Sequence, residues 1–102
     1  MLKLIKKFLK GNNLDFKTLV QNGAVIVDVR NNAEFRSGHI KGALKIPVEQ
    51  IRVKTADLKN MNKPIITCCK SGIRSGMAAS ILTSAGVEVY NGGPWNVLQG
   101  RI

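Results

Sequence analysis

The chain has 102 residues, so its length allows one compact domain and excludes a two-domain enzyme. Hydrophobic residues make up 44% of the chain, which is enough to fill a core and argues against a disordered tail or linker. Sixteen Lys and Arg against six Asp and Glu give a net charge of +10, which favours anionic partners such as oxyanion substrates, acidic proteins, anionic lipid or nucleic acid.

Residues 1–11 are predicted to form a basic amphipathic helix. On a helical wheel their apolar side chains fall on one side and their lysines on the other. Lysines interrupt every apolar run, so the segment lacks the hydrophobic stretch of a signal peptide and is expected to stay in the mature chain. We expect residues 1–10 to pack on the domain or on another copy of the chain, with contact to an anionic membrane surface as the alternative. Residues 12–102 are expected to form a single domain.

A second helix is predicted from Leu14 through Val20, with Asn13 as its N-cap and Gly23 at its end. The Gly-Asn-Asn break at residues 11–13 precedes this helix. It is the one linker candidate that the sequence offers.

The next segments alternate between strand and helix patterns. The runs AVIVDV at 24–29 and PIITCC at 64–69 are apolar without polar alternation, which is typical of strands buried on both faces of a parallel sheet. Weaker strands are predicted at 43–46 and 87–90. Helices are predicted around 32–36, 48–59 and 73–85. This alternation predicts an α/β fold with an open, mainly parallel sheet and helices on both of its faces.

The two cysteines, Cys68 and Cys69, are adjacent, so they cannot form the spaced disulfides that stabilise small secreted domains. A reducing cytoplasm is the expected compartment. With one histidine and no Cys-x-x-Cys pair, the chain lacks a four-ligand zinc set, and no metal site is expected. No stretch of the sequence is long and apolar enough to span a membrane.

Cys69 begins the segment CKSGIRS, which joins a buried strand to a helix. Ligands bind beyond the carboxyl ends of strands in open parallel sheets, and a glycine-containing loop before a helix gathers N–H groups that hold an anion or a thiolate. The helix dipole, Lys70 and Arg74 each favour the thiolate of Cys69, so its pKa is expected to lie below that of a free thiol. Cys68 should point to the opposite face of the strand and pack in the core.

Other polar and aromatic residues near these motifs are expected to support the fold. Arg30 and Glu34 are expected to form an ion pair across a strand-to-helix turn. Asp28 is expected to cap the turn that follows it through its carboxylate. We expect His39 to be a hydrogen-bonded structural residue and Trp95 to be a packing anchor.

Three motifs in order resemble the rhodanese-like sulfurtransferases. They are VIVDVRNNAEFRSGHIKGALKIP at 25–47, CKSGIRS at 69–75 and VEVYNGGPW at 87–95. The resemblance implies a rhodanese-like α/β domain in which Cys69 is the catalytic nucleophile and forms a persulfide. It also implies that the transferred sulfur or the substrate anion is bound by the loop residues Lys70, Ser71, Gly72, Ile73, Arg74 and Ser75.

The function implied by this resemblance is sulfur transfer. A small anionic donor such as thiosulfate would deliver sulfur to Cys69, and a thiol or cyanide would accept it, with no metal or organic cofactor. The sheet is expected to have four or five strands, because the segment before Asp15 lacks an obvious first strand. Pro94 shortens the usual spacing between Gly-Gly and the following Trp.

Two other functions remain open at this stage. A cysteine-dependent phosphatase also uses a cysteine, a cradle of N–H groups and an arginine, although only four residues separate Cys69 from Arg74. The domain could instead be a non-catalytic sulfur carrier or binding module whose basic surface contacts an acidic protein or tRNA. With five aromatic residues (Phe, Trp and Tyr) in the chain, nucleic acid is not an expected partner.

Overall fold

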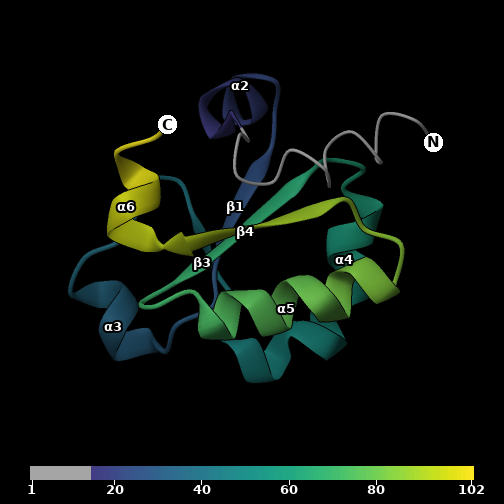
Figure 1. Cartoon of the computed structure of the whole chain (residues 1–102). Helices are drawn as coiled ribbons and strands as arrows, with labels where there is room; N and C mark the ends of the chain where they lie inside the picture. Colours follow the sequence, from purple (N-terminus) through teal and green to yellow (C-terminus); the bar gives the residue numbers. More distant parts are fainter. Residues whose placement is uncertain (1–14) are drawn as a thin grey trace.

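The computed structural model describes residues 15–102. These residues form a four-stranded parallel sheet in the order β2-β1-β3-β4 (Figure 1). The strands are β1 (Val25–Asp28), β2 (Leu44–Lys45), β3 (Ile65–Cys69) and β4 (Val89–Pro94). They run parallel because a helical segment returns the chain to the same end of the sheet between consecutive strands. The prediction of an open parallel α/β sheet is confirmed.

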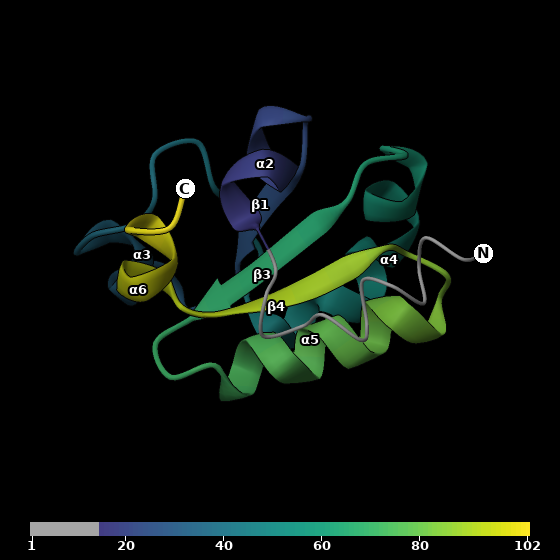
Figure 2. The same cartoon turned by 45° about the horizontal axis from the view of Figure 1, so that its top comes forward.

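Helices cover both faces of this sheet (Figures 1 and 2). The helices on one face are α4 (Ile51–Asn60) and α5 (Ile73–Ser84). Those on the other are α2 (Phe16–Gln21) and α6 (Trp95–Gln99). Two short helical segments complete the described fold, α3 (Asn32–Arg36) and the 3-10 helix η2 (Val48–Gln50). No helix between residues 15 and 102 is long and apolar enough to cross a bilayer.

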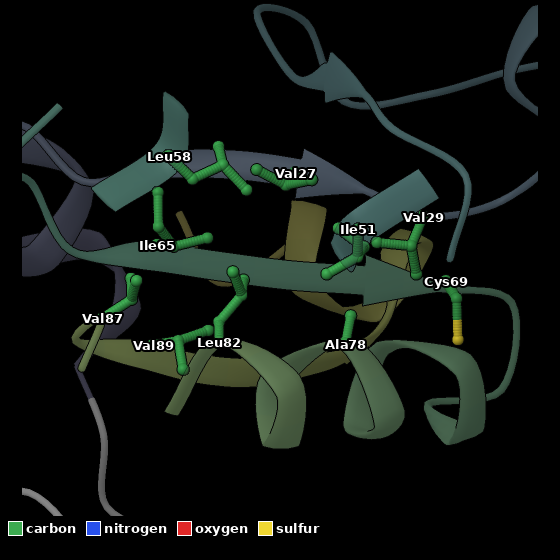
Figure 3. Packing of buried hydrophobic residues seen from close by; sticks show 10 residues of the cluster. All are labelled: Val27, Val29, Ile51, Leu58, Ile65, Cys69, Ala78, Leu82, Val87 and Val89. Carbon is green, nitrogen blue, oxygen red and sulfur yellow. The ribbon is translucent and has the colours of Figure 1, made fainter. Parts of the chain in front are cut away.

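The central strands β1 and β3 are apolar because both of their faces are buried. Successive side chains alternate between two cores. Val27 and Cys69 contribute to the core beneath α4 and α5 (Figure 3), whereas Ile66 and Cys68 contribute to the core beneath α2 and α6. The prediction that the two cysteines face opposite sides of the strand is confirmed, and both are free thiols.

Helix α2 begins later than the sequence pattern indicated. Its N-cap is Asp15, whose carboxylate accepts hydrogen bonds from the Thr18 amide at 3.0 Å and from the Thr18 hydroxyl at 2.6 Å. The prediction of Asn13 as the cap of this helix is therefore wrong, because Asp15 satisfies the free N–H groups of the first turn. The predicted N-terminal helix and the predicted linker at 11–13 lie outside the described residues.

Strand β4 also differs from the predicted strand at 87–90, because it begins at Val89 and continues through the two glycines to Pro94. The reason is a close approach of two backbones. A Cβ atom on Gly92 would lie 2.8 Å from the carbonyl oxygen of Thr67 and 2.8 Å from the Leu98 side chain. Glycine thus allows the strand to pass directly against β3, at a point where the pairing register shifts.

Candidate active site

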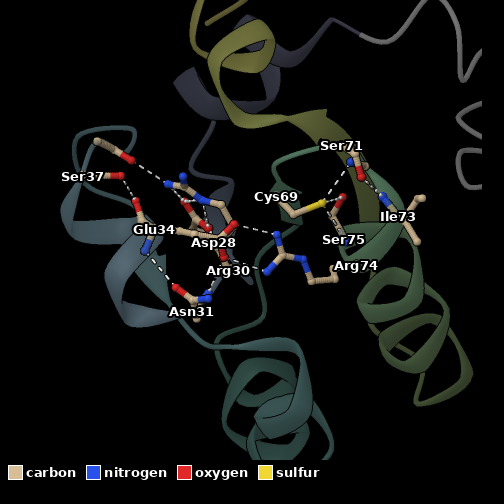
Figure 4. A network of polar contacts seen from close by, with 12 residues as sticks. Asp28, Arg30, Asn31, Glu34, Ser37, Cys69, Ser71, Ile73, Arg74 and Ser75 are labelled. Carbon is tan, nitrogen blue, oxygen red and sulfur yellow. Dashed lines mark hydrogen bonds and ion pairs between the residues drawn. The ribbon is translucent and has the colours of Figure 1, made fainter.

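Cys69 is the last residue of β3, at the carboxyl end of the sheet, and its side chain is fully buried. The chain then curls around its sulfur before entering α5 (Figure 4). The Gly72 amide donates to Sγ at 3.0 Å and the Ser75 amide donates to it at 3.4 Å. The Ser75 hydroxyl oxygen lies 3.4 Å from the same sulfur. The loop therefore directs several hydrogen-bond donors at one sulfur atom.

The tight path of this loop depends on Gly72. Its φ is +100°, in the left-handed region that glycine adopts without strain, and it immediately precedes the first residue of α5. A Cβ atom at this position would also stand 3.4 Å from the Cα of Gly93 on β4. The short loop consequently brings the N-terminal end of α5, with its free N–H groups and positive dipole, up to Cys69.

The two adjacent cysteines have opposite pKa shifts. Burial raises the pKa of Cys69, but hydrogen bonds from the Ser75 hydroxyl and from the amides of Ser75, Gly72 and Ser71 outweigh it and leave the pKa below its ordinary value. For Cys68, burial together with the nearby Asp28 carboxylate raises the pKa to about 12. Of the two cysteines, Cys69 is therefore the one whose thiolate is stabilised by its surroundings.

The positive charge of Arg74 is paired with Glu34 on α3. Its guanidinium donates to both carboxylate oxygens of Glu34, at 2.8 and 2.9 Å. This bond holds the pKa of Glu34 at about 2, with help from the Asn31 amide. The charge of Arg74 still interacts with Cys69, although it is shared with the carboxylate of Glu34. Lys70, which follows Cys69 directly, is exposed.

The predicted Arg30–Glu34 ion pair is wrong as well. Arg30 pairs with Asp28 at 2.7 Å and donates to the Gly38 carbonyl at 2.6 Å. Residues two apart along an extended chain point to the same side, so Asp28 is within reach of Arg30, while Glu34 faces α5 from α3. The carboxylate of Asp28 also accepts the Arg30 amide at 3.0 Å, which agrees with its predicted capping role.

The structural roles expected for the histidine and the tryptophan agree with the structure. His39 Nδ1 lies 2.8 Å from the Phe35 carbonyl, and its ring stacks on that of Phe35. Trp95 packs against the core beneath α2 and α6, and the Arg30 guanidinium lies 4.8 Å from the centre of its ring.

Sequence reasoning missed two residues that hold the loop. Asn91 on β4 donates from Nδ2 to the Gly72 carbonyl at 3.1 Å, and its Oδ1 accepts the Ser75 hydroxyl at 2.7 Å. Thr67 on β3 donates its hydroxyl to the Ser75 carbonyl at 2.9 Å. The available signal was a polar side chain in each strand, Thr67 in an otherwise apolar run and Asn91 before the Gly-Gly pair. Among residues 15–102 there is no group of three His, Cys, Asp or Glu side chains placed to hold a metal ion.

The sequence also matches a known family. A model of the rhodanese-like domain matches residues 12–94, which include Cys69, its loop and all four strands. The chain belongs to this family.

Individual relatives agree with this membership. The uncharacterized protein YqhL of Bacillus subtilis is 39% identical over 69 residues, which cover 67% of this chain and 54% of YqhL. The thiosulfate sulfurtransferase GlpE of Haemophilus influenzae is 34% identical over 70 residues, covering 69% of this chain and 66% of GlpE. The chain thus spans between about half and two thirds of the length of these curated relatives.

A solved structure is similar over nearly the whole fold. The crystal structure of SSP1007 from Staphylococcus saprophyticus has a TM-score of 0.70 and 31% sequence identity, and the match covers 86% of this chain and 88% of SSP1007.

Proposed function

We propose that the protein is a sulfurtransferase in which Cys69 carries the transferred sulfur as a persulfide. The observation that supports this most directly is the pair of N–H bonds that Cys69 Sγ accepts from Gly72 and Ser75. Donors of this kind stabilise a thiolate, which is the nucleophilic form of cysteine. Membership of the rhodanese-like family and similarity to thiosulfate sulfurtransferases support the same chemistry.

The proposed reaction consists of two displacements. In the first, the Cys69 thiolate attacks the outer sulfur of thiosulfate, the S–S bond of the donor breaks, and sulfite leaves with the electron pair of that bond. In the second, cyanide or a thiolate attacks the outer sulfur of the Cys69 persulfide. The bond to Cys69 breaks, its thiolate is restored, and the acceptor leaves as thiocyanate or as a new persulfide.

The loop residues have distinct roles in this proposal. The amides of Ser71, Gly72 and Ser75 stabilise negative charge on sulfur, and exposed Lys70 attracts the anionic donor. The side chain of Arg74 positions the loop through its bond to Glu34. Sulfite is a stable leaving group, so the first displacement requires no general acid.

Phosphate-ester hydrolysis is less well supported by the same geometry. During transfer, a phosphoryl group carries negative charge on several oxygens, and each of these oxygens needs a hydrogen-bond donor. Only four residues separate Cys69 from Arg74, and the Arg74 guanidinium is already bonded to both oxygens of Glu34. The short loop and the paired arginine therefore favour a single sulfur atom over a phosphate as the bound group.

Mass spectrometry of the intact protein after treatment with thiosulfate tests the proposal. We expect a gain of about 32 Da, the mass of one sulfur, that cyanide removes with formation of thiocyanate. Cys69→Ser should abolish both the mass gain and the turnover. Cys68→Ser is the matched control and should retain both, because Cys68 faces the other core.

Two outcomes would contradict the proposed function. Turnover of an aryl phosphate that depends on Cys69, with no persulfide formed from thiosulfate or an organic polysulfide, would identify a phosphatase. A folded protein that neither forms a persulfide nor hydrolyses phosphate would instead be a non-catalytic binding module.

A further inference from the structure

An apolar groove lies along the edge of the sheet that β2 forms. Two adjoining hollows of roughly 290 and 450 Å³ share Leu44 and Met61 in their linings. These two side chains are 38% and 40% exposed, so both can be reached from solvent. We call this surface the Leu44–Met61 groove, and its rim includes four lysines, Lys41, Lys45, Lys54 and Lys63.

The groove is separate from the candidate active site. Strand β2 is at the end of the sheet order and pairs with β1 alone, and both of its residues line the smaller hollow. The larger hollow reaches Val25, the first residue of β1, and Lys63, which precedes β3. Cys69 ends β3, which is separated from β2 by β1, and neither Cys69 nor any residue of its loop at 70–75 lines either hollow. Ligands of the groove would therefore not occupy the Cys69 loop.

The charge of the groove is strongly one-sided. Among its lining residues, the single acidic side chain is Asp57, in the smaller hollow. Within residues 15–102, no ion pair engages any of the four lysines, although Lys45 donates to the Asn32 side chain at 2.6 Å. A groove with an apolar floor and a positive rim is complementary to an acidic segment that also carries apolar side chains.

Charge also argues against other occupants. Residues 1–14 contain four lysines and no Asp or Glu, so this part of the chain would be repelled by the rim. A second copy of the chain carries the same net charge of +10. The groove lining contains no aromatic side chain on which a nucleic-acid base could stack, whereas Leu44 and Met61 match apolar side chains of a protein.

We propose that the Leu44–Met61 groove binds an acidic segment of a partner protein that also carries apolar side chains. The proposal does not depend on sulfur transfer, because it rests on the edge of β2 and the end of α4 rather than on Cys69. The contact buries Leu44 and Met61 beneath apolar side chains of the partner, and the four rim lysines pair with its carboxylates. Apolar burial then supplies affinity while the rim charges select for acidic sequences.

Fluorescence anisotropy with the full chain and a short labelled peptide of alternating Glu and Leu tests this. We expect saturable binding that Lys41→Glu/Lys63→Glu weakens by about tenfold or more, since each reversal replaces attraction by repulsion. Met61→Ser should weaken binding by about threefold through loss of apolar contact. The charge-matched control is Arg36→Glu/Arg52→Glu, because neither arginine lines the groove and Arg52 lies on the opposite side of α4 from Met61.

A peptide of opposite charge and a competing oligonucleotide serve as further tests of the groove. A peptide of alternating Lys and Leu should bind the lysine-reversed variant better than the unmodified chain, which excludes loss of folding as the cause of weak binding. The proposal is overturned if the Glu-Leu peptide shows no saturable binding, or if the control arginine variant weakens it as much as the lysine variant. It is also overturned if a single-stranded oligonucleotide displaces the peptide and binds equally well to Met61→Ser, because the surface would then be a phosphate-binding one.

Discussion

The bond between Glu34 and Arg74 should make a measurable, pH-dependent contribution to stability. We consider Glu34→Gln, because glutamine keeps an oxygen that can accept the Asn31 amide in the capping box, while it removes the charge and one of the two acceptors of Arg74. A carboxyl pKa of about 2, against an ordinary 4.5, corresponds to about 3 kcal/mol if the whole difference arises on folding. The side chains of Glu34 and Arg74 are 26% and 34% exposed, so screening by water reduces the expected loss to about 1–2 kcal/mol.

The sign of the pH dependence follows from the lowered pKa. The stabilisation is complete at pH values above the unfolded-state pKa near 4.5, and it disappears as the pH falls toward the folded-state pKa near 2. Urea denaturation of the unmodified protein and of Glu34→Gln, at neutral pH and at a series of acidic pH values, measures this stabilisation. The difference in free energy of unfolding should shrink between about pH 4.5 and 2.

Glu49→Gln is the matched control, because Glu49 is exposed and makes no ion pair within the described residues. It should change stability by less than about 0.5 kcal/mol at neutral pH. A Glu34→Gln difference that stays constant down to pH 2, or one no larger than that of Glu49→Gln, would refute the reasoning.

Three further predictions concern the loop and its support. At neutral pH, iodoacetamide should alkylate the Cys68→Ser protein, which retains Cys69, faster than the Cys69→Ser protein, which retains Cys68. The reason is that burial holds the pKa of Cys68 near 12. The reverse order of rates would contradict these pKa shifts. Ser75→Ala should raise the pKa of Cys69, seen as a shift of the alkylation profile to higher pH, because it removes the hydroxyl that lies 3.4 Å from the sulfur and can turn from Asn91 to donate to the thiolate. Gly92→Ala should destabilise the protein by about 2 kcal/mol or more in urea denaturation, since its Cβ meets backbone at 2.8 Å.

Much of the fold follows from local patterns in the sequence. The runs at 24–29 and 64–69 could be assigned to buried strands because two covered faces require unbroken apolar sequence. The Cys69 loop could be located because a glycine stands between a buried strand and an amphipathic helix. The path of β4 could not be predicted, because a Gly-Gly pair is typical of a turn. Its place within a strand follows only from the close approach of the neighbouring strand β3.

The partners of charged side chains were less predictable than the strands. Arg30 and Glu34 have the spacing of an ion pair, yet each has a different partner. Glu34 bonds to a residue forty positions later in the chain, and that contact depends on how α3 and α5 are arranged in space. The same holds for Asn91, whose bonds to the loop cross from β4 to the start of α5. Such pairings are set by tertiary structure, whereas sequence spacing reports only local geometry.

The alternation of Cys68 and Cys69 across β3 has a consequence for the lifetime of a sulfur-loaded protein. A thiol beside a persulfide can attack its inner sulfur, which releases the outer sulfur as hydrosulfide and leaves a disulfide. Here the second thiol lies in the other core, on the far side of the strand, and its raised pKa keeps it protonated. The sheet thus acts as a barrier between the two sulfur atoms, so a persulfide on Cys69 would persist until an external acceptor reaches it.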